Sequence, residues 1–276
     1  MLFLGNSLIQ AGIDTAAFAR GWPAGLAPET FAAGLGASTP AEHRMVLQEA
    51  LAAMPELQQV VYGYFDDQLY APVSGHWEQL IGNRAYSYRH PALAARYYAP
   101  GSRVEALMLG LVSVIPMLRD RTTLWTKVEL LRRAMGAFGL PAQQQARFGR
   151  ADDFNGLEAA DVESFQKRTQ AAVEMPTFTP ALEDALRLAE ARRIEIILVE
   201  MPMPSRHRER FYSTAQWKAL QVHTRDYATA RGLGYVAASE WIADDGFEDP
   251  THLSPHGAQR FSERLARELA AVPSPR

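Results

Sequence analysis

Two short segments at opposite ends of the chain contain residue types that could act together in catalysis. Near the start, the apolar run Leu2–Leu4 leads through a glycine and an asparagine to Ser7. Near the end, Asp249 and His252 stand three residues apart, ahead of a long helical pattern. A serine hydroxyl becomes a nucleophile when a histidine takes its proton and a carboxylate orients that histidine. If the fold brings the two ends together, the sequence predicts a serine hydrolase.

Each of these residues also has a simpler structural explanation. Ser7 could cap a helix that follows the first strand. Asp249, followed by a proline, could start a turn, and His252 could be a surface residue ahead of the final helix. The spacing favours the catalytic interpretation, because a carboxylate three residues away on a loop can reach one imidazole nitrogen while the other nitrogen faces a serine.

His256 offers a competing interpretation as a metal ligand. His252 and His256 are four residues apart, which suits a metal ion when both lie on one helix face. Pro255, however, is expected to begin the final helix after His252, and no third ligand is obvious. We therefore expect no metal site. The remaining histidines are scattered and are expected on the surface: His43, His76, His90, His207 and His223.

The composition excludes several classes of protein. The 276 residues carry a formal net charge of -3 and no long basic run, which argues against a nucleic-acid surface. No segment is long and apolar enough to cross a bilayer, because the best candidate, Val104–Leu118, is interrupted by Glu105 and Pro116. The chain has no cysteine, so disulfides, thiolate metal sites and a cysteine nucleophile are excluded.

The sequence leaves the compartment and the oligomeric state open. Proteins outside the cytoplasm can also lack cysteine. Met1 lies only six residues before Ser7, and no signal peptide is recognisable. We expect either that this is the true start or that an upstream targeting segment or anchor is missing.

Short apolar runs alternate with helical patterns over most of the chain. Such alternation predicts an α/β fold with a parallel sheet covered on both faces, a three-layer α/β/α sandwich. The expected strands are Leu2–Leu4, Glu29–Ala33, Gln59–Tyr64, Ile194–Val199 and Gly234–Ala237. The expected helices are residues 40–54, 180–192, 213–231 and 255–271. Thr39 with Pro40 and Glu42, and Ser254 with Pro255, have the residue types that begin a helix.

The predicted topology gives the two ends of the chain a reason to meet. In parallel α/β sheets, ligands bind beyond the carboxyl ends of the strands. Ser7 follows the first strand, and the Asp249/His252 loop follows the last, so both are expected at that edge. Three residues at the ends of the third and fourth strands are expected there as substrate-binding residues: Tyr64, Asp66 and Met201.

A glycine loop after the second strand is expected to serve the same site. An attacked ester carbonyl becomes an oxyanion and needs fixed hydrogen-bond donors. The backbone N–H of Ser7 at a helix start is one expected donor. Gly34 and Gly36 are expected to supply another, because glycine lets the backbone approach closely. A tight turn that feeds the next helix explains the same glycines equally well.

One long stretch, from about Leu69 to Met175, breaks the alternation. A connection of about 100 residues is far longer than a usual loop of about 4–6. It predicts a helical insertion or cap, residues 69–175, within a single domain of residues 1–276. Its helical patterns are Val104–Leu118, Thr122–Phe138 and Asp161–Val173. Its aromatic residues suit a sugar ring or an acyl chain, or else pack the insertion onto the core: Tyr70, Trp77, Tyr86, Tyr88, Tyr97 and Tyr98, with His76 among them.

These segments resemble the sequence blocks of the SGNH (GDSL-like) hydrolase family. Gly5–Leu8 resembles the nucleophile block, in which Gly-Asp-Ser is usual, and Gly34 resembles the oxyanion glycine of the second block. Asp249–Gly257 closely resembles the last block, Asp-x-x-His-Leu-x-x-x-Gly. The resemblance covers roughly residues 1–67 and 180–272. It implies a flavodoxin-like α/β/α fold and a Ser7–His252–Asp249 triad that needs no metal or organic cofactor.

The chain departs from the family pattern in two places. Asn6 stands where the nucleophile block usually has an aspartate that is not itself the nucleophile. The third block is Gly-x-Asn-Asp, whose asparagine is an oxyanion donor, and here Phe65 stands at the asparagine position. Gln68 or Asn83 could supply the donor instead. The resemblance points to branches that handle acyl groups on bacterial envelope polymers. If an N-terminal segment is missing, it also implies a periplasmic or other extracytoplasmic location, and otherwise the location stays open.

The sequence therefore predicts serine-dependent acyl-ester chemistry. With water as the acceptor, the protein is an esterase that removes an O-acyl group, with O-acetyl as the expected acyl group. With a sugar hydroxyl as the acceptor, it is a glycan O-acyltransferase. A third alternative is a non-catalytic protein of the same fold that binds a glycan. The expected partner is a small-molecule or carbohydrate acyl ester, and not nucleic acid.

Overall fold

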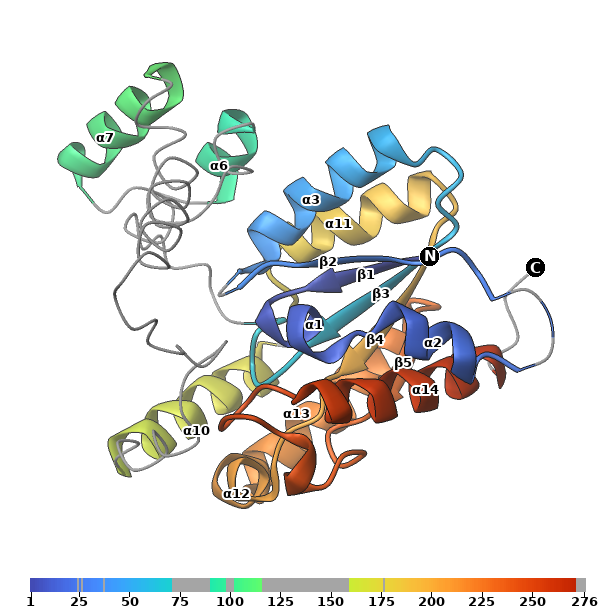
Figure 1. The fold of residues 1–276 in the computed structure, drawn as a ribbon. Helices are drawn as coiled ribbons and strands as arrows, with labels where there is room; N and C mark the ends of the chain where they lie inside the picture. The colour runs from blue at the N-terminus through green and yellow to red at the C-terminus, as the bar shows by residue number, and fades with distance from the viewer. Residues whose placement is uncertain are drawn as a thin grey trace, which may run out of the picture.

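The protein has an α/β fold built on one parallel sheet (Figure 1). The structure, a computed structural model, describes residues 1–23, 25, 27–36, 38–70, 90–97, 102–115, 159–175 and 177–271. Five strands pair in parallel in the order β2-β1-β3-β4-β5. They are β1 (Leu2–Gly5), β2 (Phe31–Gly34), β3 (Gln59–Tyr64), β4 (Glu195–Glu200) and β5 (Gly234–Ala237).

Helices cover both faces of this sheet, so the predicted three-layer α/β/α sandwich is confirmed. On one face lie α3 (Pro40–Ala53) and α11 (Pro180–Ala191) (Figure 1). α13 (Ala215–Ala230) lies beside α11 on this face, because its Tyr227 hydroxyl donates to Glu183 of α11 at 2.7 Å. The other face is covered by α1 (Ser7–Gly12), α2 (Thr15–Gly21) and α14 (Pro255–Ala271). The shorter elements are α12 (Ser205–His207), the π-helical turn η2 (Arg208–Tyr212) and the 3-10 turn η3 (Asp244–Gly246).

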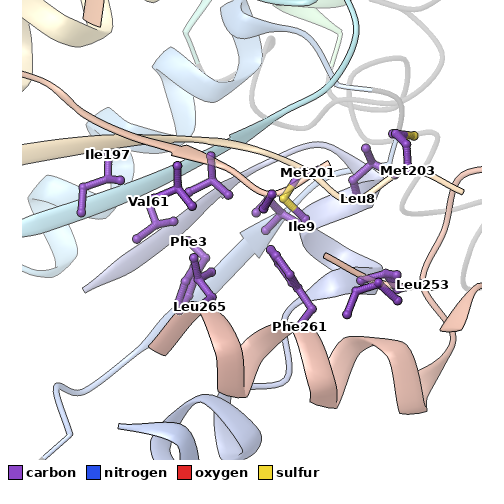
Figure 2. Packing of buried hydrophobic residues seen from close by; sticks show 14 of the residues in the cluster. Phe3, Leu8, Ile9, Val61, Ile197, Met201, Met203, Leu253, Phe261 and Leu265 are labelled. Carbon is purple, nitrogen blue, oxygen red and sulfur yellow. The ribbon is translucent and has the colours of Figure 1, made fainter. Parts of the chain in front are cut away.

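Strand side chains alternate between two hydrophobic clusters, one on each face. Phe3 and Val61 belong to the cluster beneath α14, and Leu4 and Val60 belong to the cluster beneath α3 and α11. Figure 2 shows the first cluster, with Phe261 of α14 and its neighbours facing the strands. Because both faces are buried, the strands read as continuous apolar runs in the sequence rather than as alternating ones.

The strand order reverses at β1, whose carboxyl end lies between those of β2 and β3. The chain winds outward in one direction from β1 to β2 and in the other from β1 to β3, β4 and β5. In open parallel sheets the crevice at such a reversal is where ligands bind. Ser7 lies at this point, directly past β1.

The expected strand and helix positions match the structure closely, with one shift worth noting. The second strand is Phe31–Gly34, two residues later than its expected start at Glu29. It is the edge strand of the sheet, and Phe31 and Ala32 are exposed. Its start is set by pairing, because Phe31 lies opposite Leu2, the first residue of β1, and such pairing leaves no mark in the local sequence.

The described part of residues 69–175 contains three helices: α6 (Pro91–Tyr97), α7 (Arg103–Val114) and α10 (Ala159–Glu174). The first lies in the predicted insertion with no helix pattern assigned to it, and the other two overlap predicted helices. The predicted helix Thr122–Phe138 lies outside the described residues. No helix of the described residues is long and apolar enough to span a membrane. The division into one domain with an insertion stays a prediction.

The two insertion tyrosines that can be placed both pack onto the sandwich. The Tyr97 hydroxyl donates to Asp184 of α11 at 2.6 Å. The Tyr70 hydroxyl donates to Thr224 of α13 at 3.2 Å. These contacts fit the packing explanation for these two residues. The other aromatic residues assigned to this segment lie outside the described residues: His76, Trp77, Tyr86, Tyr88 and Tyr98.

Candidate active site

Ser7 is the first residue of α1 and lies half-buried at the end of β1. Asn6 caps this helix, since its Oδ1 accepts the N–H of Leu8 at 2.8 Å. The alternative in which Ser7 itself is the cap is therefore wrong. Because Asn6 takes that role, the Ser7 hydroxyl is left for another partner.

Glycines let α1 lie close against the sheet. A Cβ added at Gly63 of β3 would lie 2.4 Å from Cδ1 of Ile9, and one added at Gly5 would lie 2.6 Å from Cγ1 of the same residue. Both distances are shorter than real Cβ contacts. The position of Ser7 is thus set by tight packing of its helix on β1 and β3.

Asp249 organises the loop that presents His252. Its Oδ1 accepts the backbone N–H of His252 at 2.7 Å and that of Thr251 at 2.8 Å. Its Oδ2 lies 2.7 Å from His252 Nδ1. Asp249 is buried, with 6% of its surface exposed. One carboxylate therefore fixes both the backbone of the loop and the orientation of the imidazole.

The structure brings His252 and Ser7 into hydrogen-bonding contact across 245 residues of sequence. His252 Nε2 lies 2.8 Å from Ser7 Oγ. With Asp249 accepting from Nδ1, the proton of the neutral imidazole is on Nδ1, and Nε2 is an acceptor for the Ser7 hydroxyl. This arrangement can remove a proton from Ser7.

The glycine at the end of the last block holds this loop against a neighbouring turn. A Cβ added at Gly257 of α14 would lie 1.9 Å from the carbonyl oxygen of Gly246 in η3. Ser254 completes the contact, because its N–H and its hydroxyl both donate to Gly246 O, at 2.9 and 3.1 Å. Ser254 also accepts the N–H of Gly257, as expected for a residue that caps α14.

The glycine loop after β2 also lies against α1. A Cβ added at Gly34 would lie 2.3 Å from the backbone N of Gln10. Gly36 is less crowded, with Gln10 Oε1 3.7 Å from an added Cβ. The close approach explains why position 34 is glycine. The assignment of Gly34 and Gly36 as oxyanion donors stays a prediction.

After β3, Gln68 rather than Phe65 lies beside the Ser7 segment. Phe65 is half-buried and packs against the hydrophobic cluster under α14. The side-chain amide of Gln68 donates from Nε2 to Ser38 O at 3.1 Å and accepts from Asn6 Nδ2 at 3.5 Å. Gln68 thus joins the residue before Ser7 to the glycine loop. Asn83, the other candidate, lies outside the described residues.

Comparison with known proteins does not assign the chain to a family. No family model and no curated protein matches it. Among solved structures, it is similar to a protein from Bacteroides fragilis that carries the provisional description of acylhydrolase. The two are 9% identical, the likeness covers 98% of this chain and 85% of that chain, and the TM-score is 0.42.

Two of the predicted substrate-binding residues have buried side chains. Tyr64 is 3% exposed, and its hydroxyl faces that of Tyr235 at 3.5 Å. Met201 is 1% exposed and belongs to the hydrophobic cluster under α14, beside Ile9 (Figure 2). The described structure thus shows packing roles for both, and their assignment to substrate binding stays a prediction.

Asp66, the third such residue, is held in an unusual backbone conformation by two partners. Its φ of 50° lies in the left-handed region, which aspartate tolerates better than most residues. Oδ1 accepts from the Tyr212 hydroxyl at 2.8 Å and lies 2.9 Å from His207 Nε2. Burial, and then the Asp66 charge, raise the pKa of Tyr212, so its hydroxyl stays protonated.

Sequence reasoning missed this cluster and misplaced two histidines. His207 and His43, expected on the surface, are 5% and 0% exposed. His43 bonds to Ser38 and Tyr62, and His207 bonds to Asp66. Nothing in the local sequence distinguishes these from surface histidines, because their partners come from other elements.

Glu200 is a buried carboxyl at the end of β4, also missed from the sequence. It is 0% exposed, and Gln221 Nε2 donates to its two oxygens at 2.8 and 3.0 Å. Burial raises its pKa to about 7, while hydrogen bonds from Gln221, Ser239 and Tyr235 oppose that shift.

The alternative metal site at His252 and His256 finds no support in the described geometry. His252 uses its two ring nitrogens toward Asp249 and Ser7. His256 is exposed on the first turn of α14. Among the described residues, no group of three or more potential ligands lies together.

Proposed function

We propose that the protein is an SGNH-type serine esterase that removes an acyl group from an ester through an acyl-serine intermediate. The observation that supports this most directly is the chain of hydrogen bonds from Asp249 through His252 to Ser7, at 2.7 and 2.8 Å. Its three members come from the two sequence blocks that resemble the family, and the nucleophile lies at the strand-order reversal where ligands bind.

The reaction uses these residues in two half-steps. His252 Nε2 takes the Ser7 proton as Ser7 Oγ bonds to the ester carbonyl carbon, giving a tetrahedral oxyanion. Collapse breaks the bond to the alcohol oxygen, and His252 returns the proton to that alcohol. Water then attacks the acyl-serine with His252 again as base, which releases the acid and restores Ser7. Asp249 stabilises the imidazolium formed in each half-step.

The oxyanion needs donors close to Ser7. The Ser7 N–H is at the first position of α1, where a helix offers its N–H no intrahelical acceptor. Gly34 and Gly36, in the loop packed on Gln10 of the same helix, are the second proposed source. Both donors are backbone N–H groups held in place by the fold, so they need not reorient when the oxyanion forms.

The test is hydrolysis of p-nitrophenyl acetate by the wild type and by Ser7→Ala. The variant is expected to lose kcat/KM by at least about a thousandfold, with unchanged circular dichroism. A fluorophosphonate should label the wild type and not the variant. Equal rates in the two proteins would rule out Ser7 as the nucleophile, and absent labelling of a folded wild type would favour a glycan-binding protein without catalysis.

Transfer to a sugar hydroxyl is the second candidate. Phe65 at the position of the usual asparagine donor favours it, because a weakened oxyanion site slows hydrolysis while an acceptor bound near the acyl-serine still competes with water. The same assay with added oligosaccharide separates the two. An esterase releases acetate at the same rate with or without sugar, whereas a transferase yields acetylated sugar in place of acetate.

A further inference from the structure

Ser38 ties the glycine loop to the strand end that leads to Ser7. It is buried, 5% exposed, and its hydroxyl donates to Leu35 O at 2.7 Å, with Gly5 O at 3.4 Å. Its backbone N–H donates to the same Leu35 oxygen at 3.1 Å. One side chain therefore spans the loop and the last residue of β1.

A buried histidine and tyrosine hold Ser38 in place. His43 Nε2 lies 2.6 Å from Ser38 Oγ, and His43 Nδ1 lies 2.6 Å from the Tyr62 hydroxyl. His43 and Tyr62 are 0% and 1% exposed. The chain of contacts thus runs from the glycine loop through α3 to the middle of β3.

The groups at the two ends of this chain, the Leu35 carbonyl and the Tyr62 hydroxyl, fix the direction of its hydrogen bonds. Ser38 has one hydroxyl proton, and the Leu35 carbonyl, which can only accept, takes it. His43 Nε2 must therefore donate to Ser38, which leaves Nδ1 to accept from Tyr62. Burial, and then the charge of Glu42, raise the pKa of Tyr62, so its hydroxyl keeps the proton it donates.

This tautomer is the reverse of that of His252. His252 presents an acceptor nitrogen to Ser7, whereas His43 presents a donor nitrogen to Ser38. His43 therefore cannot take the Ser38 proton while the chain is intact. The Ser38–His43 pair thus positions a loop rather than activating a nucleophile.

Gln68 closes the frame from the third block. Its amide donates to Ser38 O at 3.1 Å and accepts from Asn6 at 3.5 Å. Asn6 precedes Ser7 and caps its helix. The same amide thus touches the glycine loop and the nucleophile segment, the two places from which the oxyanion donors are proposed to come.

We propose that Gln68 and the buried Ser38–His43–Tyr62 chain are positioning residues that fix the glycine loop against the Ser7 segment and so set the oxyanion donors. The proposal rests on the function proposed above. Gln68 takes over, through the backbone it holds, part of what a third-block asparagine does directly.

The first test is hydrogen exchange at the backbone N–H groups of Leu35 and Ser38, which does not require activity. Gln68→Glu keeps the shape but replaces the donor to Ser38 O with an oxygen, and Tyr62→Phe removes only the hydroxyl at the far end of the chain. Both variants are expected to exchange at least about tenfold faster at these positions, with α11 and α14 unchanged. Gln58→Glu, exposed at the other end of β3, is the matched control and should behave as wild type.

If Leu35 and Ser38 exchange at the wild-type rate in both Gln68→Glu and Tyr62→Phe, the proposal is overturned, whether or not the protein is an esterase.

The second test applies where the wild type shows Ser7-dependent turnover. Both variants should then lose about ten- to a hundredfold in kcat with KM and the acid limb of the pH profile unchanged, because the misplaced groups are donors and not the base. Unchanged kcat with faster exchange would overturn the positioning role. Absence of Ser7-dependent turnover in the wild type counts against the proposed function alone, and the exchange result still decides the frame.

Discussion

The described residues contain two buried or half-buried serine–histidine pairs, and the outer partner of each histidine decides what the pair can do. His252 faces a carboxylate, Asp249, which accepts a hydrogen bond from Nδ1–H and leaves Nε2 as an acceptor. His43 faces a tyrosine hydroxyl, which donates to Nδ1 and makes Nε2 a donor. The residue beyond the histidine, rather than the serine–histidine contact itself, separates a proposed nucleophile from a structural serine.

This difference predicts the effect of Asp249→Asn. An asparagine amide can donate a hydrogen bond to His252 Nδ1, which favours the tautomer with the proton on Nε2. In that tautomer, Nε2 cannot accept the Ser7 proton. We expect kcat to fall by roughly ten-thousandfold, as for the wrong tautomer in serine proteases, while the fold is kept. Steady-state hydrolysis of p-nitrophenyl acetate measures this loss.

Asp244→Asn is the matched control for this prediction. Asp244 accepts from the backbone N–H and the hydroxyl of Ser205, at 2.7 and 2.5 Å, on the exposed turn η3. Its loss should leave kcat within about twofold of the wild type, as expected of a surface substitution. An Asp249→Asn variant with near wild-type kcat would show that His252 does not need a carboxylate to orient it.

The sequence predicts the three residues of the proposed triad but not the hydrogen-bonded residues around them. Ser7, Asp249 and His252 lie in short segments whose residue types and spacing already suggest chemistry. Gln68 was named only as a candidate, and His43 was expected on the surface. Hydrogen bonds between side chains on different elements leave no periodic signal, so such a frame becomes visible only in three dimensions.

At the scale of elements, single glycines decide where the site residues lie. The contact between Gly257 of α14 and Gly246 of η3 brings two backbones together, so neither side can yield as a flexible side chain could. The loop with His252 lies directly between these two elements. Its position depends on that contact.

Gly257→Ala is therefore expected to lower both stability and activity. The added methyl would overlap the Gly246 carbonyl, with a cost of about 1–3 kcal/mol in the free energy of unfolding. The displaced loop should also lengthen the contact between His252 and Ser7. Urea denaturation and esterase kinetics measure the two effects. His256→Ala, on the neighbouring exposed position, should change neither, and a loss of activity in that variant would revive the metal alternative.

Glu200 gives the fold a pH dependence that can be traced to one strand end. Its folded pKa of about 7 lies above the ordinary 4.5. Its contribution to stability is therefore complete below pH 4.5 and is lost as the pH rises through 7, because the unfolded chain gives up the proton earlier. The loss should amount to about 3 kcal/mol.

Glu200→Gln should remove this dependence. The variant is expected to be about 3 kcal/mol more stable than the wild type at pH 8 and close to it at pH 4.5, as measured by urea unfolding at both values. Glu190→Gln, exposed at the end of α11, should keep the wild-type slope. An equal slope in the wild type and in Glu200→Gln would show that another group controls the dependence.

Elements were predictable where burial leaves a continuous signal. The central strands β3 and β4 are apolar runs buried on both faces, and their expected bounds agree with the structure to within a residue. The edge strand β2 borders solvent, and its start was misplaced by two residues. That start is set by pairing with Leu2 of β1, which the local sequence does not reveal.

At the scale of the whole molecule, Ser7 and His252 meet because the last helix, α14, packs against the first two, α1 and α2. α14 packs along α2, and the backbone of Glu263 would lie 2.4 Å from a Cβ added at Gly21 (Figure 1). The parallel topology predicted that both ends reach the same edge of the sheet. It did not predict which side chains hold them there, because those contacts join positions about 250 residues apart.

Ser262 makes one of these long-range ties. It is 0% exposed, its hydroxyl accepts the N–H of Asp14 at 2.9 Å, and it lies 3.3 Å from Gly12 O, to which it donates. It thus joins α14 to the connection between α1 and α2. The serine that closes the two ends of the chain is different from the serine proposed to act as nucleophile.

Ser262→Ala should therefore separate stability from catalysis. The change leaves the Asp14 N–H without its acceptor, at a cost of about 1–3 kcal/mol in the free energy of unfolding. Thermal unfolding should occur several degrees lower, while kcat at 25 °C stays within about twofold because Ser7 and His252 are untouched. Ser213→Ala, an exposed serine ahead of α13, should leave the melting temperature unchanged. A melting temperature equal to the wild type in Ser262→Ala would mean that apolar packing alone holds the two ends together. A large fall in kcat with little loss of stability would instead mean that this tie sets the distance between His252 and Ser7.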